Sequence, residues 1–190
     1  LSKIYPEVAY YVPDRYKEGY GVSCKGIDFA QDNEMSLIIT LDCGIKAHDK
    51  VLYAHERGID MIITDHHTPD DTIPPAVAVL NPKRTDCSYP YKELCGCGIG
   101  FKLIQALCKS LGYPLETAYA YLDLVALATC ADIVPITGEN RILVSAGLKQ
   151  INERPSEVMQ LLLSTANPPI QVRDLVFVAA PRINAAGRMN

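Results

Sequence analysis

The sequence predicts an α/β fold, in which an open and mostly parallel sheet with flanking helices is followed by a helical section. Continuous apolar runs recur in the first 82 residues, and such runs are typical of strands that are covered on both faces. A segment with helical periodicity separates two of these runs, and after Pro82 the apolar spacing becomes helical throughout. We therefore predict that residues 1–82 form the sheet part and that residues 83–190 form a helical part, which runs into a connecting helix.

The expected strands are four short apolar runs. They are EVAYYV (Glu7–Val12), SLIITLD (Ser36–Asp42), DMIITD (Asp60–Asp65) and AVAVLNP (Ala76–Pro82). Between the second and third runs, Ala47, Val51 and Ala54 mark one face of a helix, and Gly58 is placed to cap its C-terminal end. Strand, helix and strand within about 30 residues form a βαβ unit, whose crossover is expected to be right-handed.

The second part is expected to consist of helices. Their sequences are CGIGFKLIQALCKSLG (97–112), LETAYAYLDLVALATCADIVP (115–135), GENRILVSAGLKQIN (138–152), PSEVMQLLLSTA (155–166) and QVRDLVFVAAPRINAAGRM (171–189). The first of them has its apolar residues at helical spacing and ends at Gly112, while the second is expected to end before Pro135. These helices are predicted to pack on or beside the sheet.

The composition limits the function classes. The 190 residues are 48% hydrophobic, which is enough for a substantial core, and no apolar run approaches the roughly 18 residues that cross a bilayer. We therefore expect a soluble, cytoplasmic protein that has no membrane partner. The formal net charge of −4 argues mildly against binding nucleic acid through phosphate neutralisation alone, although bound cations can supply positive charge locally.

The seven cysteines are an odd number in a chain that is long enough to need no disulfides. We therefore expect free thiols in a reducing compartment. The alternative is a zinc site built from Cys87, Cys95 and Cys97. Its C-x-C spacing and its missing fourth ligand do not fit the usual zinc-binding pairs.

Acidic and imidazole side chains follow two neighbouring strands of the expected sheet. Asp42 ends one apolar run, and Asp65, His66 and His67 end the next. In open α/β sheets ligands bind outside the carboxyl ends of the strands, so these side chains are expected at the ligand-binding edge. Carboxylate oxygen with imidazole nitrogen suits Mn²⁺, Fe²⁺, Zn²⁺ or Co²⁺, and oxygen-rich sites shift toward Mn²⁺ or Mg²⁺. The alternative is a solvated turn that Asp65 caps.

The motifs LDCG and TDHH resemble those of the DHH phosphoesterase superfamily, which is named after a triplet like Asp65-His66-His67. Four further segments resemble the RecJ-type single-strand-specific exonucleases of that superfamily. They are YYVPDRYKEGYG (Tyr10–Gly21), GCGIGFK (Gly96–Lys102), ADIVPITGENR (Ala131–Arg141) and RINAAGR (Arg182–Arg188). The tripeptide alone is a weak signal, whereas six motifs in this order are specific and extend over nearly the whole chain.

The resemblance implies a phosphodiesterase that uses two Mn²⁺ or Mg²⁺ ions and degrades single-stranded DNA from its 5′ end, in DNA repair and recombination. It implies that Asp42, His66 and Asp132 are metal ligands and that Asp42 bridges the two ions. It also implies catalytic roles for His67, close to the scissile phosphate, and for Asp65, which would support the two histidines without binding the metal itself.

The resemblance further assigns residues to the phosphates of the substrate. They are Arg15, Gly96, Gly98, Gly100, Arg182, Asn184 and Arg188. Glycine allows the backbone to approach a phosphate closely, and arginine can bind phosphate with two parallel hydrogen bonds. Other roles stay open, because the glycines can form a tight loop before a helix, Arg15 can be structural, and the RINAAGR arginines can close a domain interface.

One departure from the superfamily matters most. An aspartate-rich motif of the form D-x-D-x-D-G is expected upstream of Tyr10, and these 190 residues do not contain it. We therefore expect a fragment that lacks N- and C-terminal parts of its own chain, binds at most one metal ion weakly and is nearly inactive alone. Two other functions remain open: a phosphodiesterase for short oligonucleotides or cyclic dinucleotides, and a non-catalytic DNA-binding relative.

Overall fold

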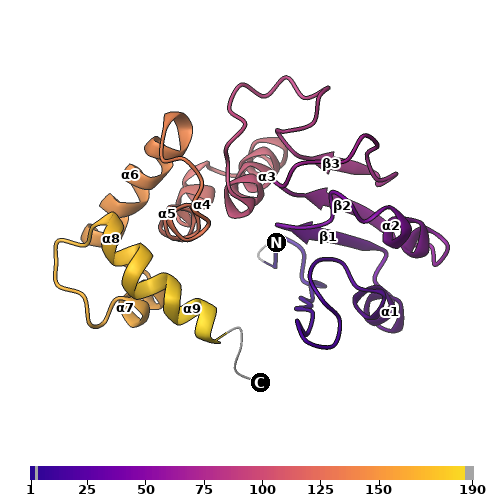
Figure 1. Cartoon of the computed structure of the whole chain (residues 1–190), viewed down its shortest axis with the longest axis horizontal. Helices are drawn as coiled ribbons and strands as arrows, with labels where there is room; N and C mark the ends of the chain where they lie inside the picture. The colour runs from indigo at the N-terminus through magenta and orange to yellow at the C-terminus, as the bar shows by residue number, and fades with distance from the viewer. Residues whose placement is uncertain (3, 187–190) are drawn as a thin grey trace. The chain divides into compact units, whose positions relative to one another are not determined.

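The computed structural model describes residues 1–2 and 4–186 of the chain (Figure 1). It divides into two compact units, Leu1–Leu80 and Asn81–Asn190. The first unit holds the strands and the second holds a series of helices, so each unit is described by itself. This arrangement confirms the predicted fold class.

The first unit is built on a three-stranded parallel sheet with the strand order β1-β2-β3. Its strands are β1 (Leu37–Leu41), β2 (Asp60–Thr64) and β3 (Ala78–Leu80). Leu41 pairs with Thr64, so β1 and β2 end at the same level, and Thr64 pairs in turn with Leu80. Three of the four predicted strands are thereby confirmed, together with their parallel direction.

The fourth predicted strand, Glu7–Val12, is wrong. This segment is irregular, and its apolar side chains face solvent, with Tyr10 90% and Val12 79% exposed. A β-rich composition describes a side-chain preference for a half-buried pleated surface and does not provide a strand with a partner. Without a neighbouring strand to pair with, the segment has no ladder in which its peptide groups could take part.

Two helices of the first unit, α1 (Cys24–Asp32) and α2 (His48–His55), pack against one face of β2. Ile27 of α1, Val51 of α2 and Ile63 of β2 belong to the same buried core. Helix α1 was not predicted, although Ser23 marks its start by accepting a hydrogen bond from the Gly26 amide. Leu37 and Leu41 of β1 are exposed, so the expected cover on both faces is not met at this strand.

Gly58 ends the crossover helix as predicted. Its φ of 71° lies in the left-handed region, its amide donates to the carbonyl of His55, and the Ile59 amide donates to the carbonyl of Ala54. These two bonds form a Schellman motif, which satisfies carbonyls that the helix end leaves without partners. The motif turns the chain directly into β2.

The second unit consists of helices. They are α3 (Gly96–Leu111), α4 (Glu116–Tyr119), α5 (Leu122–Ala131), α6 (Gly138–Glu153), α7 (Glu157–Leu162), α8 (Val172–Asp174), the π-helical turn η1 (Leu175–Ala179) and α9 (Ala180–Ala186). Residues of α5, α6, α7, η1 and α9 share one apolar core. Helices α5 and α6 approach closely at Gly147, where an added Cβ would collide with the Leu122 carbonyl and the Ala126 side chain. None of the described helices is long and apolar enough to cross a membrane.

Three predicted helices differ from the observed ones in detail. The segment 115–135 is interrupted between α4 and α5, because Tyr121 leaves helical geometry with φ −105° and ψ 10°, and it ends at Ala131. The segment 155–166 keeps only α7. The segment 171–189 is helical through residue 186 but contains the π-turn η1 just before Pro181, which has no amide hydrogen to give to the preceding turn.

Candidate metal centre

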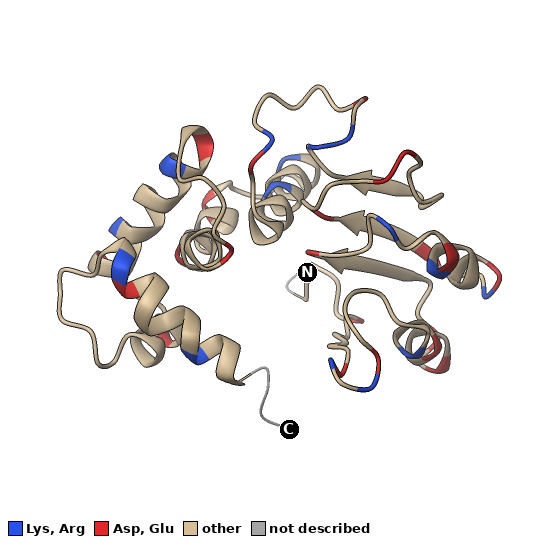
Figure 2. Cartoon of the chain, viewed as in Figure 1, with Lys and Arg blue, Asp and Glu red and all other residues tan. Residues whose placement is uncertain are grey.

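The sheet brings Asp42 and Asp65 to one edge of the first unit. Each follows the last residue of its strand, and those last residues, Leu41 and Thr64, are paired. The Asp42 amide donates to the Thr64 carbonyl at 2.9 Å, so the hydrogen bonding between β1 and β2 continues one residue beyond the end of β1. In Figure 2, red segments that mark Asp or Glu lie at the edge of the sheet where β1 and β2 end. Asp42 and Asp65 therefore lie at the same edge of the sheet, as expected for residues that follow two neighbouring parallel strands.

Asp42 adopts an unusual backbone conformation. Its φ is 64°, and Gly44 two residues later has a φ of 107°, so the chain turns sharply between β1 and α2. Aspartate tolerates the left-handed region better than most residues, and sparsely populated backbone conformations often cluster at functional sites. The Thr40 hydroxyl donates to the Cys43 carbonyl at 2.7 Å and braces this turn. The Asp42 side chain is 55% exposed, so its carboxylate is accessible to a ligand.

Asp65 is the buried hub of the site, with 1% of its surface exposed. One oxygen, Oδ2, accepts the Ile45 amide at 2.9 Å. The other, Oδ1, accepts the His66 amide at 2.7 Å and lies 2.7 Å from Nδ1 of the His67 ring. Burial alone would raise the pKa of this carboxyl, but the hydrogen bonds from Ile45 and His67 outweigh it and hold the pKa below its ordinary value. Asp65 therefore remains a carboxylate at neutral pH.

Asp42, His66 and His67 form a cluster of potential metal ligands. One donor atom from each lies within 4.8 Å of the others, and this is the one such group of histidine, cysteine and acidic side chains within residues 1–2 and 4–186. Asp42 Oδ1 and His66 Nε2 are 3.2 Å apart. Two ligands that bind one ion at about 2.1 Å and at right angles would be about 3 Å apart, so this spacing suits neighbouring positions on a single divalent ion. The residues therefore fit a metal.

The cysteine beside this cluster is not prepared to act as a thiolate. Burial, with the nearby carboxylates of Asp65 and Asp42, raises the pKa of the Cys43 thiol to about 11. None of the seven cysteines belongs to the ligand cluster of Asp42, His66 and His67. The oxygen and nitrogen donors of Asp42 and the histidines therefore define the chemistry of the site.

The segment that follows His67 is held to the start of α2. The Lys46 ammonium lies 2.7 Å from Asp70, and the His48 ring is 3.1 Å from the Thr72 carbonyl. No role was predicted for these residues, because exposed polar side chains in a turn carry no pattern that reveals their partners. Their contacts restrict the loop that carries the two histidines of the cluster.

The remaining predicted ligand, Asp132, belongs to the second unit and is described there by itself. It follows the last residue of α5, its amide donates to the Ala128 carbonyl, and it is exposed. Ile133 beside it has a φ of 58°. The metal-binding role of Asp132 stays a prediction.

The predicted phosphate-binding glycines do not lie in a loop. Gly96, Gly98 and Gly100 are buried in the first turns of α3, and the Gly98 amide donates to Sγ of Cys95 at 3.3 Å. Cys95 thus acts as the N-terminal cap of α3, and it uses one of the amides that could have faced a phosphate. A role of these glycines in substrate binding stays a prediction, and close helix packing is a second reason for their small size.

The predicted arginines have different surroundings. Arg15 is exposed in the loop before α1, with its guanidinium carbon 4.3 Å from the centre of the Tyr20 ring. Arg182 of α9 points its guanidinium at the end of α7, where it donates to the Leu162 carbonyl at 2.6 Å and to the Thr165 hydroxyl at 2.8 Å. Asn184 is exposed on α9, while Arg188 lies outside the described residues.

Arg182 therefore has a structural partner, which the end of a short helix leaves available. We expect Arg182→Ala to lower the free energy of unfolding by about 1–3 kcal/mol, because the carbonyl groups at the end of α7 lose a charged donor. Urea unfolding measures this loss. Arg173→Ala is the matched control, since Arg173 is largely exposed and its ion pair with Asp174 is 3.9 Å long. Equal effects of the two substitutions would contradict the capping role.

The comparisons with known proteins agree with this geometry. Residues 1–129 match the sequence profile described as DHH family, N-terminal domain. The chain therefore belongs to the DHH family. Within that family it is 42% identical over 199 residues to the single-stranded-DNA-specific exonuclease RecJ of Dickeya dadantii, and the match covers 97% of this chain and 34% of the relative. The RecJ of Thermus thermophilus is 36% identical, and there the match covers all of this chain and 28% of the relative.

Solved structures give the same result for the fold. A crystal structure of exonuclease RecJ bound to manganese superimposes with a TM-score of 0.83 at 37% identity, covering 94% of this chain and 45% of that one. A crystal structure of RecJ from Thermus thermophilus in complex with Mn²⁺ gives a TM-score of 0.75 at 35% identity, covering 86% and 24%. The chain thus spans about a third or less of the length of the relatives named above.

Proposed function

We propose that this chain is the metal-binding part of a divalent-metal-dependent phosphodiesterase that hydrolyses single-stranded DNA from its 5′ end. The observation that carries the proposal is the cluster of Asp42, His66 and His67 at the carboxyl edge of the sheet. The similar RecJ proteins are named as single-stranded-DNA-specific exonucleases, and two of their structures contain manganese. Such an activity would belong to DNA repair and recombination in the cytoplasm.

The proposed ligands are Asp42, His66 and Asp132, with Mn²⁺ or Mg²⁺ as the ion. A divalent ion at this place would activate a water molecule and neutralise charge on the phosphate, and two ions would share these tasks. The three proposed ligands would hold the ion and through it orient the water molecule and the phosphate. The backbone of Asp42 is fixed by its turn and the His66 side chain is buried, which favours a defined ion position.

His67 is proposed to contact the scissile phosphate, and Asp65 to orient it. Asp65 Oδ1 accepts a hydrogen bond from Nδ1 of His67, so the proton of the neutral ring resides on Nδ1 and Nε2 stays available. The His67 side chain is 60% exposed, which leaves room for a phosphate oxygen. A fixed tautomer allows Nε2 to accept a proton, or to donate one when the ring is charged. Positively charged contacts to other phosphates are proposed for Arg15 and Arg188.

The 190-residue chain alone is expected to show little or no hydrolysis. Its proposed ligands provide at most three anchored donors, whereas two closely spaced ions need more carboxylates to offset their charge. The measurement is release of nucleotides from a 5′-labelled single strand in Mn²⁺. Turnover by the purified chain that His66→Ala abolishes would show that these residues already form a complete site.

Substrate class is tested on a longer protein that contains these residues. A long single strand is expected to be hydrolysed at least tenfold faster than duplex DNA, a dinucleotide or a cyclic dinucleotide, and blocking the 5′ end should stop the reaction. Preference for dinucleotides would instead favour a phosphodiesterase of short oligonucleotides. Binding of single strands without hydrolysis in any divalent metal would favour a non-catalytic relative.

A further inference from the structure

The segment between α5 and α6, residues 132–137, holds a strained residue next to the proposed ligand Asp132. Ile133 has a φ of 58°, and its side chain is 91% exposed. Branching at Cβ makes this left-handed conformation a steric outlier for isoleucine. The exposed side chain gains no burial that would compensate for it. Contacts elsewhere in the segment must therefore maintain the conformation.

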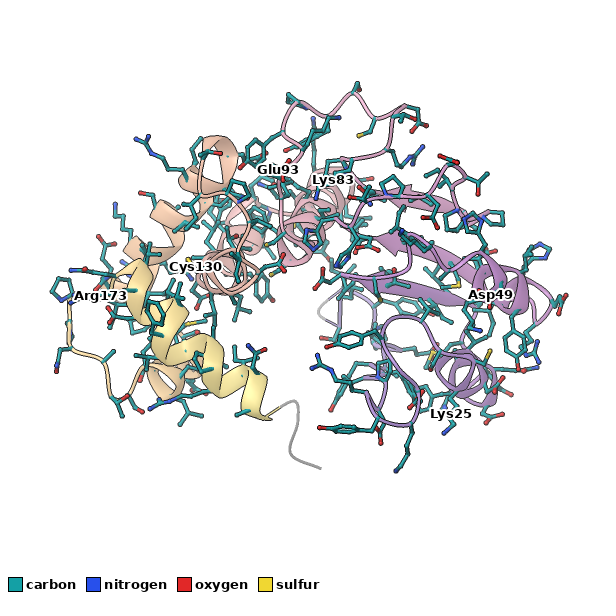
Figure 3. The ribbon with its side chains drawn as sticks, in the orientation of Figure 1. Lys25, Asp49, Lys83, Glu93, Cys130 and Arg173 are labelled. Atoms are coloured by element: carbon teal, nitrogen blue, oxygen red, sulfur yellow. The ribbon has the colours of Figure 1, made fainter. Side chains whose placement is uncertain are left out.

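Asn140 provides the first of these contacts. It lies in the first turn of α6 and is fully buried, and its side-chain Nδ2 donates to the Pro135 carbonyl at 3.0 Å. The same nitrogen donates at 2.6 Å to the carbonyl of Glu93, which is labelled in the loop leading into α3 (Figure 3). One buried amide group thus ties residues 132–137 to a second segment of the same unit. Hydrogen bonds of this kind are costly to leave unmade, because the amide group of Asn140 is fully buried and has no access to water.

Tyr91 provides the second contact, from the same loop. Its hydroxyl donates to the Thr137 carbonyl at 2.9 Å and lies 3.2 Å from the Pro135 carbonyl. Gly138 makes room for the ring, since an added Cβ there would come within 2.7 Å of it, and its φ of 46° also favours glycine. We call Tyr91 and Asn140 together the Tyr91–Asn140 latch.

A third side chain fixes the loop before α3 that carries Tyr91. Glu139 accepts a hydrogen bond from the Tyr89 hydroxyl at 2.7 Å and forms an ion pair with Lys102 of α3. Burial and this hydrogen bond raise the pKa of Tyr89 above its ordinary value, so its hydroxyl remains a donor at all physiological pH values. Glu139 and Asn140 of the GEN sequence therefore bond to residues of the loop before α3, and Gly138 leaves space for the Tyr91 ring.

We propose that Tyr91 and Asn140 are positioning residues that hold residues 132–137 in the strained conformation and thereby set how Asp132 is presented to a metal ion. The inference rests on the proposed function for the role of Asp132. It adds a function for the buried asparagine and the tyrosine, which touch neither metal nor substrate themselves. It also explains why a β-branched residue keeps a positive φ at an exposed position.

The first test measures the strain without metal. Ile133→Asn is expected to raise Tm by about 2–6 °C, because asparagine tolerates the left-handed region and Ile133 buries little. In an Asn140→Ala background the segment can relax, so the gain should fall below about 1 °C. Asn152→Ala is the matched background: Asn152 also lies on α6 and donates to the Leu148 and Ile170 carbonyls, away from residues 132–137. In the Asn152→Ala background the gain in Tm from Ile133→Asn should persist. An equal gain in the unchanged chain, in Asn140→Ala and in Asn152→Ala would overturn the inference.

The second test measures Mn²⁺ affinity of the chain by the relaxation of water protons, which detects weak binding. Asp132→Asn and Asn140→Ala are each expected to raise the Kd for Mn²⁺ about tenfold, which is the lower end of the loss in metal affinity seen when a supporting contact is removed. Asn152→Ala should leave this Kd unchanged. Tyr91→Phe keeps the ring and removes only the hydroxyl, so it should raise Kd about two- to fivefold and stays informative if Asn140→Ala folds poorly.

The outcomes separate the two proposals. Sensitivity to Asp132→Asn without sensitivity to Asn140→Ala and Tyr91→Phe would overturn the positioning role and leave the metal ligand intact. An unchanged Kd for Asp132→Asn, or no Mn²⁺ binding up to millimolar concentrations, would overturn the ligand assignment and with it the presentation of Asp132.

Discussion

Replacing Asp65 by alanine is expected to lower the free energy of unfolding by about 3–5 kcal/mol. The substitution leaves the amides of Ile45 and His66 without their acceptor, and it removes the carboxylate that lies beside the His67 ring. Each buried donor that loses its partner costs about 1–3 kcal/mol. Urea unfolding followed by circular dichroism measures the loss.

Asp49→Ala is the matched control for this substitution. Asp49 is an exposed acid whose salt bridge is with the adjacent Lys50, and removing it should change the stability by no more than about 0.5 kcal/mol. The loss in the free energy of unfolding for Asp65→Asn should fall between those for Asp65→Ala and Asp49→Ala. The asparagine keeps one oxygen as an acceptor, but its NH₂ group faces a backbone amide that is also a donor. A loss below about 1 kcal/mol for Asp65→Ala would mean that Asp65 is not the structural hub of the site.

Asp42→Asn is expected to weaken Mn²⁺ binding by the chain at least tenfold and to leave its stability nearly unchanged. The substitution removes the negative charge of the ligand, while asparagine tolerates the φ of 64° about as well as aspartate does. Because the Asp42 side chain is more than half exposed, the free energy of unfolding should change by less than about 0.5 kcal/mol. Isothermal titration with Mn²⁺ and urea unfolding give the two values.

Asp70→Asn is the control for charge alone. Asp70 is an exposed acid of the same loop region, paired with Lys46 and outside the ligand cluster. It should leave the Mn²⁺ affinity within about twofold of the unchanged chain. A similar loss for both substitutions would indicate diffuse attraction of the cation in place of direct ligation by Asp42. In a longer protein that contains these residues, Asp42→Ala should abolish metal-dependent activity.

Much of the first unit follows from local sequence patterns. The three strands of the sheet and the crossover helix were predictable because their apolar runs and the glycine at position 58 act over a few residues. The segment Glu7–Val12 failed because strand formation depends on a partner that composition does not reveal. The short helix α1 was missed because Ser23 and two buried residues, Ile27 and Ala30, form only a brief pattern.

The candidate site was predictable to the extent that topology determines it. Parallel strands that end together bring Asp42 close to the residues after β2, and the chemistry of those residues is explicit in the sequence. The partners of Asp65 depend on tertiary contacts, because the Ile45 amide comes from a turn 20 residues away. Arg182 also depends on tertiary contacts, because no local sequence pattern predicts that it caps the end of α7.

The most direct test of the metal centre is to titrate Mn²⁺ into the ¹⁵N-labelled chain and to record which amide signals broaden first. Mn²⁺ broadens nearby nuclei strongly, so the bound position appears at low metal concentration. The expected result is early loss of the signals of Asp42, Cys43, His66 and His67, together with that of the proposed ligand Asp132, and the absence of this loss in the Asp42→Asn variant. Broadening that begins elsewhere, or spreads evenly over the exposed acids, would contradict a metal site built from Asp42 and His66.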